Sequence, residues 1–486
     1  MLKWVGGTFL APAAVAAGYG EAAWPFLAAA AITVGCGLGL DQITGSKRGT
    51  AVGPRESFLV VALIWLLVPI FGAIPFVLGD VPQLSRVVDA YFESVSGFTA
   101  TGATVLTDIE ALDHAMRFWR QLSHWLGGMG IIVLAVAVLP RLRVGGRQLL
   151  QSELAGPTEI ERFSATIRET ARRLWSLYVG LTVVAILVLA LVGWTGLDDA
   201  MTPFEAVSHA LSVIALGGFS SQNESAAAFV PLTQYLLLLF MILAGVNFLR
   251  LYRLLVQRQV TVVRADEELR LYGAFLVLGS ALIIVELLAG DFARGEEAVR
   301  TGMFQAVAIM STTGFGTADY TQWGPLAVMT LLLLMFVGAS AGSTGGSIKV
   351  VRHLLLFKLV KRELDSTIHR EIVRPITANG MAIEERSLRS MVVFVLLYLL
   401  TFAIGSLALL LDARFGGGES LTAFEAIGAS AACIGNVGPA FGFAGPFGSY
   451  QPMSDLSTGI LTMLMWLGRM EIIPVAVLLS RNYWRG

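Results

Sequence analysis

The chain has 486 residues, of which 55% are hydrophobic and only 14% are charged, and its formal net charge is −1. A soluble protein usually carries about 25% charged residues, so this composition excludes an ordinary soluble enzyme and indicates an integral membrane protein. Lysine and arginine lie mostly between apolar stretches, a distribution that gives no indication of a nucleic-acid partner.

Ten apolar stretches follow one another along the chain, each near or above the roughly 20 residues that a membrane-spanning helix needs. They cover residues 4–20, 23–40, 57–79, 118–140, 173–194, 230–254, 271–290, 324–357, 389–411 and 456–480. The sequence therefore predicts an all-α, multi-pass protein of the lipid bilayer.

The basic residues predict its orientation. Of the 34 lysines and arginines, 27 lie at the two termini and in residues 41–57, 141–173, 250–270 and 349–389. Because basic loops stay on the cytoplasmic side, we expect both termini to be cytoplasmic. The opposite loops are acidic, which is compatible with a cation-attracting vestibule or with simple solvation of those loops.

Four of the loops on the opposite side share one pattern. Each has a moderately apolar piece of about 10 to 14 residues, too short to span the membrane, so a re-entrant helix is expected. Each piece carries a Phe-Glu or Phe-Gln pair: Phe92-Glu93, Phe204-Glu205, Phe304-Gln305 and Phe424-Glu425. The glycines Gly102, Gly218, Gly314 and Gly438 follow. Since Phe204 and Phe424 lie 14 residues before their glycines and the other two lie 10 before, we expect longer second and fourth pore helices.

This recurrence predicts four tandem helix–pore-helix–helix repeats around one pore, after two N-terminal transmembrane helices. The units are residues 1–56 for the N-terminal helices, then 57–140, 141–257, 258–362 and 363–486 for the repeats. A re-entrant helix presents the negative end of its dipole to the membrane centre, and the following glycine can turn carbonyl oxygens towards the axis. Such carbonyls replace the water around a cation. The candidate filter residues are Ala100, Thr101, Gly102, Leu216, Gly217, Gly218, Thr312, Thr313, Gly314, Asn436, Val437 and Gly438.

The stretch 324–357 is too long for one straight crossing and is interrupted by glycines and serines, which hold a helix poorly. We expect a flexible loop that occludes the pore below the filter; the alternative is a close helix crossing through small residues. The candidate gate residues are Gly338, Gly342, Ser343, Thr344, Gly345, Gly346, Lys349 and Arg469. Lys349 is either a pore-facing charge or a cytoplasmic anchor. Arg469, in the middle of a span, is either a positive barrier in the pore or the partner of a carboxylate such as Glu471.

Several of these motifs resemble the TrkH/KtrB/HKT superfamily of potassium transport proteins. The resemblance lies in residues 97–105 (GFTATGATV), 124–130 (HWLGGMG), 341–349 (AGSTGGSIK) and 436–439 (NVGP). The two additional N-terminal spans favour the TrkH type of membrane subunit. Ala100 and the Leu216-Gly217 pair depart from the family pattern.

This resemblance implies potassium as the substrate, with no cofactor in this chain, in the bacterial inner membrane. It also implies a homodimer with one pore per protomer and a cytosolic ring of TrkA-type nucleotide-binding regulators. The glycine in the first filter, Gly102, resembles the corresponding residue of the potassium-selective members of the superfamily.

Two other functions compete with a gated pore. A secondary transporter, a potassium symporter driven by protons or sodium, also uses broken helices and glycine loops at the membrane midplane. An enzyme is not predicted, because the five histidines are scattered and no catalytic constellation stands out. His209 and Glu205, four residues apart on one helix, are expected to bond to each other.

Overall fold

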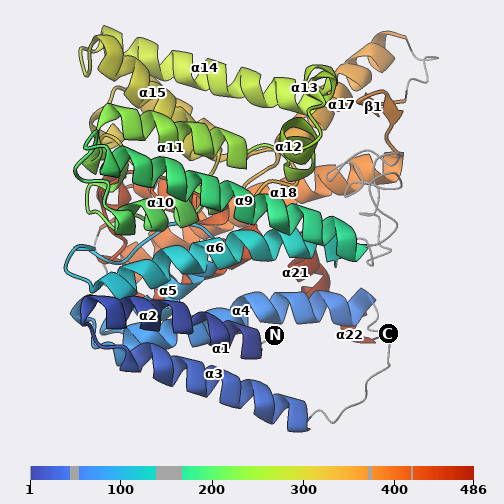
Figure 1. The fold of residues 1–486 in the computed structure, drawn as a ribbon. Coiled ribbons are helices and arrows are strands. Elements are labelled where there is room, and N and C mark those ends of the chain that lie inside the picture. Colours follow the sequence, from blue (N-terminus) through green and yellow to red (C-terminus); the bar gives the residue numbers. More distant parts are fainter. Residues whose placement is uncertain (1, 44–53, 138–166, 370–374, 417–419, 486) are drawn as a thin grey trace.

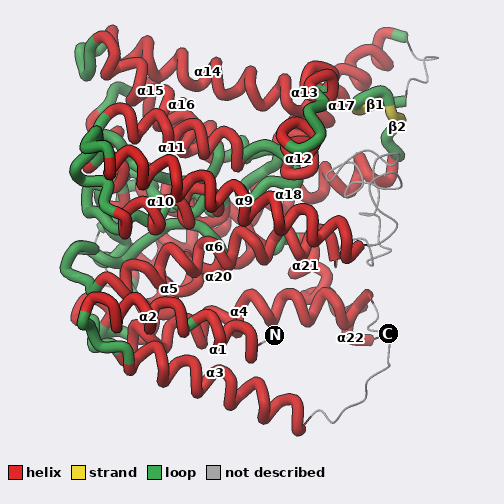
Figure 2. The backbone as a smooth tube through the Cα atoms, viewed as in Figure 1, coloured by secondary structure: helices red, strands yellow, loops and turns green. Residues whose placement is uncertain are grey.

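The computed structural model describes residues 2–43, 54–137, 167–369, 375–416 and 420–485. Within them the fold is almost entirely helical (Figure 2), with one small antiparallel pair of strands, β1 (Thr377–Ala378) and β2 (Met381–Ala382). Most long helices run side by side (Figure 1), with α12, α13, α17 and the β hairpin on one side of the molecule. The all-α prediction is confirmed for the described residues.

The helices succeed one another along the whole chain. The α helices are α1 (Leu2–Thr8), α2 (Leu10–Tyr19), α3 (Trp24–Ile43), α4 (Pro54–Leu78), α5 (Val87–Phe98), α6 (His114–Ala137), α9 (Ile167–Trp194), α10 (Pro203–Ala215), α11 (Pro231–Ala244), α12 (Phe248–Leu255), α13 (Val260–Ala265), α14 (Glu267–Ala289), α15 (Gly295–Met310), α16 (Pro325–Met335), α17 (Val350–Ile368), α18 (Glu385–Phe415), α19 (Ala423–Ile434), α20 (Asp455–Arg469), α21 (Ile473–Leu479) and α22 (Arg481–Arg485). The 3₁₀ turns are η1 (Pro82–Leu84), η3 (Ser225–Ala228), η4 (Tyr320–Gln322) and η5 (Gly442–Ala444).

Five described helices are long and apolar enough to cross a membrane: α3, α14, α18 and the apolar parts of α4 and α9. Two bent helix pairs raise the number to seven if each pair is one span. The expected span at 4–20 covers α1 and α2, which only Phe9 separates, and Phe9 keeps helical backbone angles (φ −66°, ψ −16°). Pro12 lacks the amide hydrogen that would bond to the carbonyl of Thr8, so the helical hydrogen bonding is interrupted at this point.

The expected spans at 230–254 and 456–480 each fall on a sharply bent pair of helices rather than on one continuous helix. α11 and α12 meet at 110°, and α20 and α21 meet at 113°. The first bend follows from Asn247, whose side chain accepts hydrogen bonds from the amides of Leu249 and Arg250 and so starts a new helix. The second precedes Pro474, which occupies the first turn of α21 and cannot continue a preceding helix.

The other expected spans differ in extent. The stretch 118–140 lies in α6, but its last residues, 138–140, fall outside the described residues, as do the predicted domain boundary at 140/141 and most of the basic segment 141–173. The stretch 324–357 is divided between α16 and α17, with a non-helical segment from 336 to 349.

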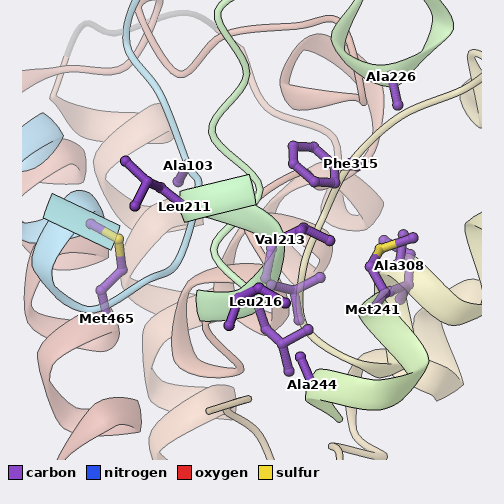
Figure 3. Packing of buried hydrophobic residues seen from close by; sticks show 14 of the residues in the cluster. Ala103, Leu211, Val213, Leu216, Ala226, Met241, Ala244, Ala308, Phe315 and Met465 are labelled. Carbon is purple, nitrogen blue, oxygen red and sulfur yellow. The ribbon is translucent and has the colours of Figure 1, made fainter. Parts of the chain in front are cut away.

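The short helices α5, α10, α15 and α19 lie among the long ones. Each packs on the helices that flank it in sequence: α5 on α4 and α6, α10 on α9 and α11, α15 on α14 and α16, and α19 on α18 and α20. In addition, α10 packs on α6, and α5 packs on α20, so the last part of the chain returns to the first. One apolar cluster runs through the centre, and Figure 3 shows Ala103, Leu216, Phe315 and Met465 from four distant parts of the chain within it.

The expectation of longer second and fourth pore helices is wrong. The four helices have 12, 13, 16 and 12 residues, so the third, α15, is the longest. The caps decide the lengths: Thr202 and Thr422 cap α10 and α19 just before the phenylalanine, whereas α15 begins at Gly295, with Glu296 and Glu297 in its first turn.

Candidate functional site

The four short helices end in the same backbone arrangement. One or two positions beyond each helix, a residue adopts left-handed angles: Ala100 (φ 51°), Leu216 (φ 53°), Thr312 (φ 63°) and Asn436 (φ 53°). The next residue donates its amide hydrogen to a carbonyl five residues back: Thr101 to Ser96 (2.9 Å), Gly217 to Ser212 (3.1 Å), Thr313 to Ala308 (2.8 Å) and Val437 to Ala432 (2.8 Å). This is the Schellman motif, which satisfies the last carbonyls of a helix. The chain is thus turned in the same way four times.

The glycine that follows each motif touches the next loop. All four have positive φ: 85° at Gly102, 80° at Gly218, 80° at Gly314 and 100° at Gly438. A Cβ atom added at Gly102 would lie 2.3 Å from the oxygen of Gly217, at Gly218 1.8 Å from that of Thr313, at Gly314 2.1 Å from that of Val437, and at Gly438 2.5 Å from that of Thr101. The contacts run from the first loop through the second, third and fourth and back to the first. They therefore form a closed ring that only glycine fits.

The ring brings together all twelve candidate filter residues, because each loop contributes three consecutive ones. A pocket of about 620 Å³, open space included, is lined by all four glycines and by none of residues 336–349. Asn223, also in that lining, donates its side-chain amide to Asp108 at 2.9 Å. This hydrogen bond lowers the pKa of Asp108, so a carboxylate beside the pocket is kept ionised.

A buried ion pair braces the first loop against the second. Arg120 Nε on α6 lies 2.8 Å from Glu93 Oε1 on α5, and both side chains are almost fully buried. Glu93 also accepts hydrogen bonds from Thr104 Oγ1 (3.0 Å) and from the amide of Val105 (3.2 Å), just beyond Gly102. Arg120 in turn donates to the carbonyl of Ser220 in the second loop at 3.0 Å.

In the second and third segments, His209 and Gln305 of the short helix bond to side chains of their own helix and loop. His209 Nδ1 lies 3.2 Å from Glu205 Oε2, which confirms the expected contact, and His209 Nε2 lies 3.0 Å from Ser220 Oγ. Gln305 donates to Thr317 Oγ1 at 3.3 Å. Glu93, His209 and Gln305 each lie nine residues before their glycine. The Phe-Glu and Phe-Gln pairs do not lie at a constant distance from the glycine, so an alignment on these pairs does not place His209 opposite Glu93. An alignment on the glycines does.

Residues 336–349, where the sequence predicts a gate, form a largely buried, non-helical loop, which we call the gate loop. The alternative interpretation, a helix that crosses a neighbouring helix through small residues, is wrong, because residues 336–349 are not helical. Its base is closed by hydrogen bonds from the amide of Gly338 to the carbonyl of Ile348 (2.9 Å) and from the amide of Val350 to the carbonyl of Ala339 (3.3 Å). Gly342 has left-handed backbone angles (φ 71°), and Ser343 Oγ bonds within the loop to the carbonyl of Ser340.

The gate loop lies against the C-terminal ends of three of the short helices, α10, α15 and α19. Thr344 Oγ1 donates to the carbonyl of Ile214 in α10 at 3.2 Å, and the amide of Gly346 donates to Thr312 Oγ1 at 2.7 Å. A Cβ atom at Gly345 would lie 2.8 Å from the carbonyl oxygen of Ser311. At Gly346 it would lie 2.4 Å from the oxygen of Gly435, which precedes the fourth glycine loop. Close packing against the ends of these helices therefore explains why Gly345 and Gly346 are glycines.

The bend between α11 and α12 holds the other side of the gate loop. Ser340 donates its amide to the carbonyl of Gly245 (3.0 Å), and Asn247 Nδ2 donates to the carbonyl of Ala341 (2.6 Å). Glu268, at the start of α14 and 1% exposed, accepts the amide of Ala341 at 2.6 Å and pairs with Arg250. The sequence did not predict this contact between the bend and the gate loop. Its local signal is Asn247, a helix-capping residue that follows Gly245.

Arg469 is buried at the end of α20 and crosses to two neighbouring elements. Its guanidinium donates to the carbonyl of Thr344 in the gate loop (2.9 Å) and to that of Gly127 in α6 (3.2 Å). The expected alternative, a pair with Glu471, is wrong, because Glu471 pairs with Arg352 at 2.8 Å.

Lys349 is buried and donates through Nζ to the carbonyl of Gly345, within the gate loop. Lys349 is therefore held inside the protein by the loop that precedes it. The described residues place two buried cations, Lys349 and Arg469, in direct contact with the gate loop.

Several apolar membrane-crossing helices around a ring of glycine-bearing loops define a helical membrane transport protein. The chain matches the TrkH family, described as cation transport proteins, over residues 28–485. The protein belongs to the TrkH family.

Its relatives agree over nearly their whole length. The Trk system potassium uptake protein TrkH of Escherichia coli (strain K12) is 36% identical over 433 residues, which cover 89% of this chain and 86% of that one. TrkH of Vibrio parahaemolyticus is 35% identical over 487 residues, covering 98% and 96%. The crystal structure of the potassium transporter TrkH from Vibrio parahaemolyticus superposes with a TM-score of 0.87 at 32% identity, covering 100% of this chain and 97% of that one. The relatives are named as transport proteins, in agreement with the prediction that the chain is not an enzyme.

Proposed function

We propose that this protein takes up potassium across the bacterial inner membrane through a gated pore. The names of its relatives, potassium uptake proteins of the Trk system, support the substrate. The closed ring of four glycine loops carries the proposal of a pore, since four backbone strands around one axis can offer carbonyl oxygens in place of a hydration shell. The pore helices direct their C-terminal ends, with their partial negative charge, towards the same place.

The filter comprises residues 100–102, 216–218, 312–314 and 436–438, three per loop. Only the first and third loops carry a hydroxyl directly before the glycine, at Thr101 and Thr313; the second has Gly217 and the fourth has Val437. Ligation is therefore less uniform than in a filter of four identical strands. The four repeats are the units 57–140, 141–257, 258–362 and 363–486.

The gate comprises the gate loop and Arg469. In the present conformation the loop is bonded beneath the filter, and a buried positive charge repels an approaching cation. Potassium passes when the loop leaves the ends of the pore helices and Arg469 moves with it.

The protein works as a homodimer with a TrkA-type nucleotide-binding ring on its cytoplasmic side. The relatives are named as parts of a Trk system, which supports a partner. The side that carries α12, α13, α17 and the β hairpin is the cytoplasmic one, on the basis of its lysines and arginines, and both termini lie in the cytoplasm.

Rubidium uptake into proteoliposomes tests this function. The purified protein is reconstituted without a proton or sodium gradient, and a membrane potential is applied through a potassium-independent route. A pore takes up rubidium under voltage alone. An absolute requirement for a proton or sodium gradient would instead support a symporter, and no rubidium uptake under any gradient would contradict potassium transport.

A further inference from the structure

The second loop of the ring lacks a side chain that the other three possess. The residue before the ring glycine is Thr101, Thr313 or Val437 in the first, third and fourth loops, and each is fully buried. In the second loop this residue is Gly217. Its φ is not in the left-handed region, so backbone conformation does not demand glycine here. Something else occupies the volume behind the loop.

That volume holds the imidazole of His124, which comes from α6. A Cβ atom added at Gly217 would lie 2.2 Å from His124 Nδ1, 2.4 Å from Cγ and 2.8 Å from Cε1. Real Cβ atoms do not come this close to a ring, and His124 is itself fully buried. The glycine and the histidine are therefore complementary in shape.

The imidazole also holds the residue after the ring glycine. The amide of Phe219 donates to His124 Nδ1 at 3.4 Å, and the Phe219 ring stacks on the imidazole with centroids 4.1 Å apart and planes 14° apart. Nδ1 lies 3.3 Å from Ser212 Oγ, on the last turn of α10. One side chain thus contacts the helix before the loop, the loop itself and the residue beyond it.

We propose that His124 is a positioning residue that sets the ion selectivity of the second filter loop, by supplying from α6 the buttress that Thr101, Thr313 and Val437 supply from within their own loops. This proposal rests on the proposed filter. Without a side chain packed behind it, the second loop can shift its carbonyl oxygens away from the axis. The potassium-to-sodium permeability ratio then falls while the protein still conducts.

A double-mutant cycle tests the complementarity. The variants are His124→Ala, Gly217→Thr and the two together, and the measured quantity is the potassium-to-sodium permeability ratio of the reconstituted protein. Each single variant should reduce the ratio about tenfold, within the range that residues in contact show in such cycles, and the double variant should recover most of the loss. His124→Asn, whose side-chain oxygen can accept the Phe219 amide, should keep more selectivity than His124→Ala. His369→Ala, at an exposed position just beyond α17, is the matched control and should leave the ratio unchanged.

Unchanged selectivity in His124→Ala, or a double variant as poor as the sum of the two single ones, would overturn the proposal. A second measurement covers variants that do not conduct: the thermal midpoints of the four proteins in detergent should show the same coupling, with the double variant more stable than the worse single variant. Failure of the proposed function is distinct, because the unmodified protein would then take up no rubidium while the thermal cycle still reports whether the pair is coupled.

Discussion

Replacing Arg469 by alanine should raise basal cation flux. The guanidinium bonds to the carbonyls of Thr344 and Gly127 and so ties the gate loop to α6. A unit charge costs a passing cation about 4 kcal/mol at 4 Å and about 2 kcal/mol at twice that distance, at an effective dielectric constant near 20. The smaller value alone corresponds to a rate change of about 30-fold.

The same substitution also releases the gate loop. Hydrogen bonds from a charged group contribute about 1.5–3 kcal/mol each, and two are lost, so the open conformation gains population as well. Rubidium uptake into proteoliposomes measures the total effect. Arg469→Lys keeps the charge and separates the two contributions: it should raise flux less than Arg469→Ala. If folded Arg469→Ala protein conducts no more than the unmodified protein, the side chain is structural and the barrier is refuted.

Three further outcomes follow from the ring, the gate loop and the buried ion pair. Gly102→Ala should abolish rubidium uptake, because the added Cβ atom would lie 2.3 Å from the carbonyl oxygen of Gly217. The control Gly180→Ala, whose Cβ atom would have no neighbour within 4 Å, should take up rubidium normally, and equal uptake by the two variants would contradict the ring. Deleting residues 340–346 should raise basal uptake, and a folded deletion variant with unchanged or lower uptake would contradict the gate. Glu93→Ala should leave Arg120 buried without its carboxylate and reduce stability by about 3–5 kcal/mol, measured by thermal unfolding in detergent; a midpoint like that of exposed Glu297→Ala would argue against the brace.

Local sequence determined the elements of the site. Apolar stretches of spanning length, a short amphipathic piece before each glycine and the run of small residues at 338–347 are one-dimensional signals, because helix length, helix termination and backbone freedom are local properties. Gly102, Gly218, Gly314 and Gly438 were therefore found without knowledge of their neighbours. The bends after Ala244 and Arg469 also have local signals, in Asn247 and Pro474. The long apolar stretches around these residues nevertheless favoured the prediction of continuous spans.

Only the tertiary structure decided which groups meet. Nothing in the order of residues places Gly438 against Thr101, Arg469 against Thr344, or His124 behind Gly217, since each pair is brought together by packing of distant helices. The fate of Arg469 illustrates the reason: Glu471 is its neighbour in sequence, but the sharp bend between α20 and α21 turns that carboxylate to Arg352 and leaves the guanidinium to backbone carbonyls. A buried polar group takes the partners that its surroundings offer, and those surroundings exist only once the chain has folded.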